Sequence, residues 1–226
     1  MSSKWVVKSV WAAGTYHQER NERCQDYVAV AHNGNITAIA LADGAGSCSR
    51  AEAGARITAE TTAQVMALHA EELATLDMQS IRHFVLMSVR MALDVYCWDE
   101  DVYLKDMGST MLVVAATEKN MIIVHLGDGW IDKVNNENEH SFLSLPENGR
   151  RRNQTYLTSM IPVLEHVRVQ VIPLEGIEAV TIFSDGWEKE KVRFDLDEIN
   201  TALEKGKVDN LHEDDVAAIR MVRKHK

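Results

Sequence analysis

The stretch ITAIALADG, residues 36–44, is an apolar run of strand length that ends in an aspartate and a glycine. Two further segments repeat this pattern, VHLGDG at residues 124–129 and TIFSDG at residues 181–186. Asp-Gly is a common hairpin turn because both residues tolerate a positive φ. The pair Asp128-Gly129 fits such a turn, since a strand is predicted to follow it. The pattern predicts no returning strand after the other two pairs, so their aspartates are candidates for chemistry.

Hydropathy patterning along the rest of the chain predicts packed layers of sheet and helix. Residues 52–76 and 81–95 carry apolar side chains at helical spacing, and residues 196–203 form a shorter predicted helix. Strands are predicted at residues 5–12, 27–31, 36–42, 111–116, 121–126, 130–134, 167–172, 179–183 and 216–222. The pattern weakens between residues 133 and 167, which we interpret as surface loop. Because the two long helices follow the third strand together, the sequence disfavours a doubly wound parallel sheet.

Composition and charge disfavour several classes of protein. The 226 residues carry 34 acidic and 24 basic side chains, and the net charge of −10 disfavours nucleic acid as a partner. The sequence shows neither a membrane-spanning run nor a secretory signal, so we expect no membrane association. The three widely spaced cysteines form no zinc or disulfide pattern, which fits a reducing compartment, and we expect a cytoplasmic protein. The length favours one domain over residues 1–226.

Several aspartates stand beside predicted strand ends. They are Asp26, Asp43, Asp128, Asp185 and Asp214. If the strand ends align at one edge, these carboxylates converge, and their repulsion and desolvation require compensation. A divalent cation supplies it, and oxygen-only ligands suit Mg²⁺ or Mn²⁺ better than Zn²⁺. Two such ions can hold and acidify a water for attack on phosphorus. The sequence contains no dinucleotide fingerprint, P-loop, GxSxG elbow or HExxH motif.

In these motifs the sequence resembles the metal-dependent protein phosphatases of type 2C, and within them the compact bacterial branch. The matching segments follow the family's order: GTYH (residues 14–17), CQD (24–26), ADGAGS (42–47), GST (108–110), GDG (127–129), NQT (153–155), SDG (184–186) and DD (214–215). The resemblance implies an α+β fold, a four-layer αββα sandwich of two antiparallel β-sheets flanked by helices. It also implies a phosphatase whose partners are phosphoserine or phosphothreonine proteins, with a Ser/Thr kinase or its targets as candidates.

The resemblance assigns roles within the aspartate cluster. Asp43 would bridge two Mn²⁺ or Mg²⁺ ions, and the carbonyl of Gly44 would bind one of them. Asp185 and Asp214 would bind the other ion, and the adjacent Asp215 leaves open which of the two neighbours binds. Water activated by the ions would attack the phosphorus directly, without a phosphoenzyme.

Two further aspartates and a histidine take supporting roles by the same resemblance. Asp26 would hold metal-bound water, and Asp128 would bind a third, weaker ion. His17 would act in catalysis, by gripping the phosphate or by protonating the leaving group. Without the resemblance, a lone histidine such as His17 is more often a structural hydrogen-bonding residue.

The sequence departs from the family pattern near the expected phosphate-binding positions. Gln25 stands where many members have an acidic residue, Asn21 lies near the position of an arginine, and Ala45 replaces a histidine of eukaryotic members. These departures favour an alternative function, a catalytically weak or inactive regulatory or binding module of the same fold. The retained aspartates favour the phosphatase, because buried carboxylates without a metal are costly. A metal-dependent phosphodiesterase is a third hypothesis.

Overall fold

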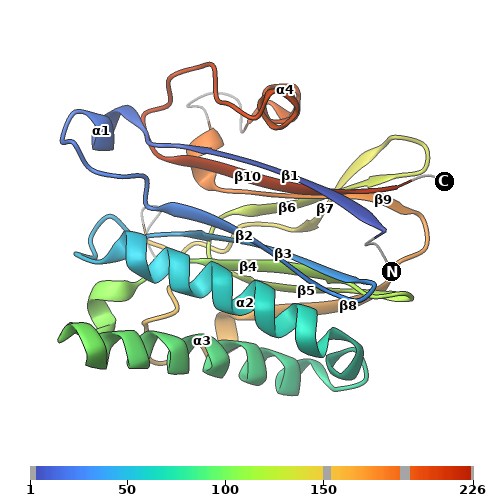
Figure 1. Ribbon diagram of the computed structural model, residues 1–226, viewed down its shortest axis with the longest axis horizontal. Helices are drawn as coiled ribbons and strands as arrows, with labels where there is room; N and C mark the ends of the chain where they lie inside the picture. Colours follow the sequence, from blue (N-terminus) through green and yellow to red (C-terminus); the bar gives the residue numbers. More distant parts are fainter. Residues whose placement is uncertain (1–3, 150–153, 189–193, 225–226) are drawn as a thin grey trace.

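The computed structural model describes residues 4–149, 154–188 and 194–224, in which two antiparallel sheets pack face to face (Figure 1). In the first sheet the strand order is β1 (Trp5–Ala12), β10 (Val216–Arg223), β9 (Ile177–Phe183), β6 (Trp130–Asn135) and β7 (His140–Ser144). In the second sheet it is β2 (Asp26–Asn33), β3 (Ile36–Asp43), β4 (Met111–Ala116), β5 (Asn120–Leu126) and β8 (Arg168–Pro173).

Helices cover the outer faces of both sheets and complete the layers (Figure 1). On the second sheet lies α2 (Ala51–Leu73), with α3 (Met78–Glu100) packed against it. The first sheet is covered by α4 (Leu196–Lys205), and the single turn α1 (Thr15–Gln18) follows β1. Short 3-10 turns are η1 (Leu104–Met107), η2 (Leu164–His166) and η3 (Asp185–Trp187). The predicted four-layer αββα sandwich is confirmed.

Strand β3 is buried along nearly its whole length because both of its faces are covered. Ile39 and Leu41 point into the core between the sheets, whereas the alanines that alternate with them face α2. These small side chains let α2 approach the sheet closely. Near its N-terminal end α2 also touches the chain around η1, where a Cβ on Gly54 would lie 2.1 Å from the carbonyl oxygen of Met107.

Local signals explain where the longer helices begin and end. Asp77 precedes α3 and its side chain accepts a hydrogen bond from the backbone N–H of Ser80. Asp195 caps α4 in the same way, and that helix ends at Gly206, whose φ of +67° suits a glycine. Across the described part of the chain, no helix combines the length and the apolar character needed to cross a bilayer.

The predicted elements are all present, with ends that differ by a few residues from the prediction, but two interpretations are wrong. Residues 133–167 are not entirely loop, since they contain β7, an edge strand whose alternation is hidden by the polar His140 and Ser141. The pair Asp128-Gly129 is not a hairpin turn. Strands β5 and β6 belong to different sheets, so this pair lies where the chain crosses from the second sheet to the first.

Candidate metal centre and active site

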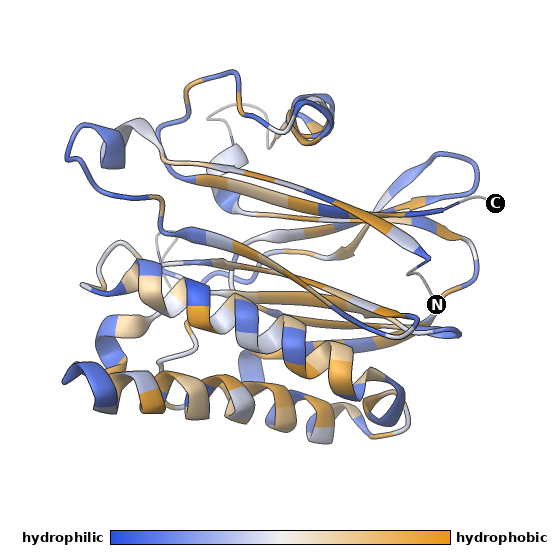
Figure 2. Ribbon diagram, viewed as in Figure 1, coloured by the Kyte–Doolittle hydropathy of each residue, from blue (hydrophilic) through white to orange (hydrophobic). Residues whose placement is uncertain are grey.

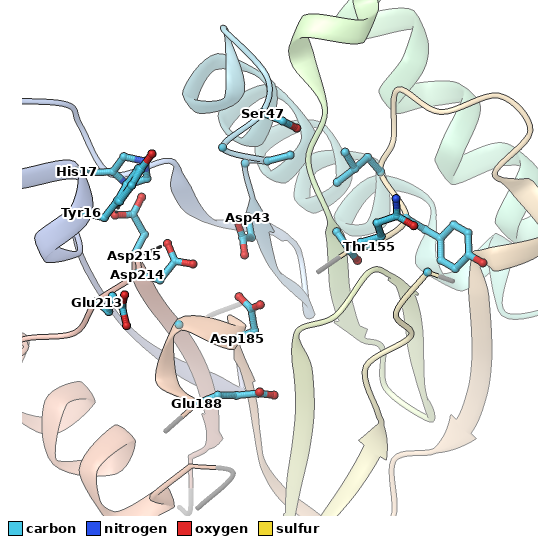
Figure 3. A pocket seen from close by; sticks show the side chains of 18 of the residues that line it. Tyr16, His17, Asp43, Ser47, Thr155, Asp185, Glu188, Glu213, Asp214 and Asp215 are labelled. Atoms are coloured by element: carbon cyan, nitrogen blue, oxygen red, sulfur yellow. Dashed lines mark hydrogen bonds and ion pairs between the residues drawn. The ribbon is translucent and has the colours of Figure 1, made fainter. Parts of the chain in front are cut away.

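The predicted aspartates gather at one end of the sandwich, and Figure 3 shows Asp43, Asp185 and Asp214 around the cleft there. Antiparallel pairing places Asp26, the first residue of β2, directly opposite Asp43, the last residue of β3. Asp185 follows β9, and Asp214 precedes β10, the antiparallel neighbour of β9. Because one strand ends where its neighbour begins, each pair of aspartates meets at the same end of its sheet. The sheet packing then brings the two pairs together.

Three carboxylates form the centre of the cluster. Asp43, Asp128 and Asp185 each offer an oxygen, and these oxygens lie within 4.8 Å of one another. Asp43 and Asp185 line a cleft of about 1420 Å³, together with Gly44 and Asp214. A set of oxygen donors at this spacing fits a divalent cation such as Mg²⁺ or Mn²⁺.

Burial and mutual repulsion make this cluster costly to ionise. Burial, followed by the charge of Asp128, raises the pKa of Asp185 to about 7. Burial raises the pKa of Asp43 well above its ordinary value, and the charges of Asp26 and Asp185 raise it further. Burial likewise raises the pKa of Asp128. The cluster therefore needs either protons or a cation to balance its charge.

Asp26 is buried next to this centre. Its Oδ2 accepts a hydrogen bond from Ser184 Oγ at 2.7 Å, whereas its Oδ1 is buried and has no hydrogen-bond partner within the described residues. The Ser184 hydroxyl is itself fixed, because it accepts a hydrogen bond from Ala217 N at 2.9 Å. Burial raises the pKa of Asp26 well above its ordinary value, and the charge of Asp215 adds to this increase. A water beside a cation would satisfy the unpartnered oxygen.

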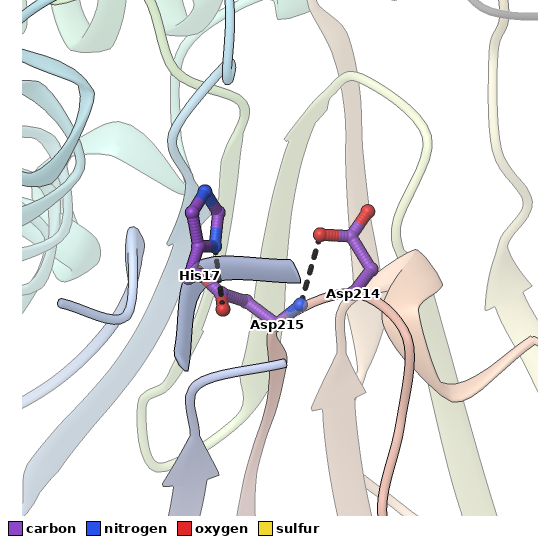
Figure 4. Close-up of side chains that lie close together, drawn as sticks. All are labelled: His17, Asp214 and Asp215. Carbon is purple, nitrogen blue, oxygen red and sulfur yellow. Dashed lines mark hydrogen bonds and ion pairs between the residues drawn. The ribbon is translucent and has the colours of Figure 1, made fainter. Parts of the chain in front are cut away.

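The two neighbouring aspartates just before β10 have different surroundings (Figure 4). The buried carboxylate of Asp215 accepts hydrogen bonds from Gly14 N at 2.7 Å, Gln25 N at 2.6 Å and His17 Nδ1 at 2.8 Å. Asp214 is exposed, and one of its oxygens accepts a hydrogen bond from Asp215 N. Asp215 therefore anchors the surrounding chain, which leaves Asp214 as the candidate ligand.

Close backbone packing holds the segment that carries these aspartates in place. A Cβ on Gly186 would lie 1.8 Å from the carbonyl oxygen of Asp215, and a Cβ on Gly14 would lie 2.3 Å from the carbonyl carbon of Asp214. Both distances are shorter than any real contact, so a side chain at either glycine would push the segment away.

We expect Asp215→Ala to lower the free energy of unfolding by about 3 to 5 kcal/mol, because it leaves buried donors without their acceptor. Urea unfolding in the presence of EDTA measures this loss without any contribution from bound metal. The adjacent Asp214→Ala is the matched control, and it should change the stability by less than about 1 kcal/mol because this side chain is exposed. Equal losses in the two variants would contradict the anchoring role of Asp215.

The arginines that flank Asn21 differ in their partners. Arg23 lies 3.4 Å from the carboxylate of Glu52. The guanidinium of Arg20 stacks on the ring of Tyr16, 3.7 Å from the ring centre, and donates a hydrogen bond to the Tyr16 carbonyl oxygen. Tyr16 lines the cleft. Arg20 is therefore the better placed of the two arginines to reach a ligand in the cleft.

The structure brings the predicted site residues to one end of the fold: Asp26, Asp43, Gly44, Asp128, Asp185, Asp214 and His17. Of the predicted segment 153–155, Asn153 lies outside the described residues, and the other two residues line the cleft. Sequence reasoning missed the roles of Ser184 and Asp215, which hold Asp26 and His17. Their only signal in the sequence is that each stands next to a predicted ligand.

Comparison with known proteins was made for the sequence and for the fold. The family model described as Protein phosphatase 2C matches residues 13–214. A search among curated proteins finds no match. A solved bacterial serine phosphatase is similar with a TM-score of 0.68 and 12% identity, over 97% of this chain and 98% of that chain. The serine/threonine phosphatase Stp1 from Staphylococcus aureus has a TM-score of 0.67 and 13% identity, with coverage of 100% and 97%. RsbX, solved in complex with magnesium, has a TM-score of 0.59 and 15% identity, with coverage of 99% and 98%.

Proposed function

The chain belongs to the protein phosphatase 2C family, and we propose that it is a Mn²⁺- or Mg²⁺-dependent hydrolase of phosphoserine and phosphothreonine monoesters in proteins. The observation that carries the proposal is the convergence of Asp43, Asp128 and Asp185 beside an open cleft. Partly buried carboxylates this close together are stable only when protons or cations offset their charge.

The candidate ligand atoms of the aspartates and of the Gly44 carbonyl are all oxygens, which fits divalent cations. We assign the ions to the following ligands: Asp43, the Gly44 carbonyl, Asp185 and Asp214, with Asp128 for a third ion. We assign Asp26 to hold water beside them, since its Oδ1 has no hydrogen-bond partner among the described residues. When bound, such ions activate water and offset the charge of the phosphoryl group.

Among the side chains of the cleft, we assign His17 a direct role in the reaction. Asp215 holds the Nδ1 of this ring at 2.8 Å, and this hydrogen bond fixes the ring orientation. The Nε2 is then the atom that binds a phosphate oxygen or gives a proton to the leaving group. Arg20, stacked on Tyr16 beside the cleft, offers a guanidinium for the phosphate in place of the missing family arginine.

Hydrolysis of an aryl phosphate tests the proposal. We expect turnover with Mn²⁺, a loss of at least about a hundredfold with excess EDTA, and recovery when Mn²⁺ is restored. A phosphothreonine peptide should also be a substrate, whereas an aryl phosphodiester should not be hydrolysed. Turnover of the diester alone would contradict the proposal and favour a phosphodiesterase.

The departures at Asn21 and Ala45 favour a second candidate function, a regulatory or binding module that retains the metal site. Such a module would be stabilised by Mn²⁺, since a ligand that binds only the folded state raises the melting temperature. It would nevertheless hydrolyse no monoester. Melting curves and turnover measured on the same preparation separate the two functions.

A further inference from the structure

Helix α3 lies at the outer side of the helical layer on the second sheet (Figure 1), and Figure 2 shows apolar residues recurring along it. Five of its apolar side chains are exposed and form a stripe on one face. We call it the α3 stripe, and it consists of Phe84, Met87, Met91, Val95 and Trp98. The exposed fraction reaches 66% at Met91 and 88% at Trp98. At 100° per residue, these positions fall within an arc of about 80° on the helix surface.

The fold itself does not need the α3 stripe. A different face of α3 supplies the core, through the buried side chains Ile81, Val85, Leu86, Val89 and Leu93. Only Phe84 of the stripe makes a ring contact within the described residues, edge-to-face with His69 of α2. A row of large apolar side chains left exposed on one helix marks an interaction surface.

The spacing of the α3 stripe is symmetric about Met91. Met87 and Val95 lie four positions to either side of it, and Phe84 and Trp98 lie seven positions to either side. When two identical helices pack antiparallel around a two-fold axis at Met91, Met87 faces Val95 of the second copy. In the same register Phe84 faces Trp98 of the second copy. A two-fold dimer requires such a self-complementary patch.

The charges along α3 favour the same antiparallel arrangement. Residues 78–93 contain Arg82, His83 and Arg90 and no acidic residue, whereas residues 94–101 contain Asp94, Asp99, Glu100 and Asp101 and no basic residue. Arg82 and Glu100 lie on the opposite face of the helix, whereas Arg90 and Asp94 flank the stripe on the same side. Antiparallel packing with Met91 at the axis brings Arg90 of one copy near Asp94 of the other. Parallel packing would bring the two acidic halves together, which is unfavourable.

We propose that the α3 stripe is the interface of a homodimer, in which α3 packs antiparallel against α3 of a second copy with Met91 at the two-fold axis. One helix from each copy buries less than the roughly 1,200–2,000 Å² of a standard stable interface. The dimer is therefore reversible, with a Kd on the order of 1 to 100 μM.

Sedimentation velocity of the full chain, from about 1 to 300 μM, tests the dimer. Wild type should pass from monomer to dimer across this range. Met91→Glu places two carboxylates at the axis and should raise the Kd at least about tenfold. Met78→Glu is the matched control, because Met78 is also an exposed methionine of α3 but lies about 140° around the helix from Met91, and its Kd should stay unchanged. A monomer at every concentration, or equal Kd values for wild type and Met91→Glu, would overturn the proposal.

A charge pair tests the register separately. Met87→Lys and Val95→Glu should each weaken the dimer, because each puts an unpaired charge against an apolar side chain. In the double variant each lysine faces a glutamate of the second copy, so the Kd should return to within about threefold of the wild-type value. Both positions are exposed, and unchanged melting temperatures would show that the fold is intact. A double variant that is weaker than both single variants would rule out this register.

Discussion

Asp43→Asn should lower kcat/KM for an aryl phosphate in the presence of Mn²⁺ by at least about a thousandfold, which corresponds to about 4 kcal/mol of lost transition-state stabilisation. The reason is the position of Asp43, whose carboxylate lies within 4.8 Å of those of Asp128 and Asp185. A neutral amide removes both the charge and one ligand oxygen from this centre. The control is Asp132→Asn, an even more buried aspartate of β6 that is held by His140 at 2.6 Å and lies outside the cluster. This variant should keep its activity.

The melting temperature distinguishes a variant that has lost only the metal site from one that no longer folds. In EDTA, Asp43→Asn should melt at a higher temperature than wild type, because the substitution removes a charge that burial and the nearby Asp26 disfavour. Added Mn²⁺ should then stabilise the variant much less than it stabilises wild type. A lower melting temperature in EDTA together with lost activity would instead indicate unfolding, and would contradict the assignment of Asp43 as a ligand.

The second large effect that we expect is a dependence of the free energy of unfolding on pH in the metal-free protein. The pKa values of Asp26, Asp43, Asp128 and Asp185 are raised by burial, that of Asp185 to about 7. Between the ordinary carboxyl pKa of about 4 and these raised values, the folded state binds more protons than the unfolded state. Stability is therefore highest near the lower limit of this window and is lost as the pH rises through it. For Asp185 alone, the rise in pKa to about 7 corresponds to roughly 4 kcal/mol of stability that is lost across this window.

Urea unfolding in EDTA at pH 5 and at pH 7.5 measures this dependence. We expect the metal-free protein to be several kcal/mol more stable at pH 5, and we expect Asp185→Asn to show a smaller difference. With saturating Mn²⁺ the order should reverse, because ligand carboxylates must be deprotonated to bind a cation. A metal-free protein that gains stability from pH 5 to pH 7.5 would show that the aspartates do not share a buried site.

Much of the fold can be predicted from the local pattern of apolar and polar residues. The apolar run that forms β3 predicts a buried strand, and the periodic segments around α2 and α3 predict two neighbouring helices. The convergence of Asp26 with Asp43 also follows from the sequence, because a hairpin places the end of one strand beside the start of the other. The sheet to which each strand belongs does not follow, since strand assignment depends on packing between distant segments. This is why Asp128 resembles a hairpin residue in the sequence but lies at a crossing between sheets.

The hydrogen-bond partners of the candidate ligands could not be predicted from the sequence for a related reason. Asp214 and Asp215 are chemically identical, and only the backbone path decides which carboxylate points to the cleft. That path depends on Gly14 and Gly186, whose missing side chains admit the segment before β10. Ser184 likewise acquires its role only when β9 and β10 bring it beneath Asp26.

The position of β10 between β1 and β9 has a consequence for the synthesis of the chain. β1 pairs along its full length with β10, and the hydrogen bond from Gly14 to Asp215 spans 201 positions. At the usual rate of about 5–20 residues per second, the ribosome makes β1 roughly 10 to 40 s before it makes β10. During this interval the nascent chain holds β1 without its partner strand, and Asp26 and Asp43 without Asp214. The set of predicted site residues is therefore complete only after Asp214, just before β10, has been translated.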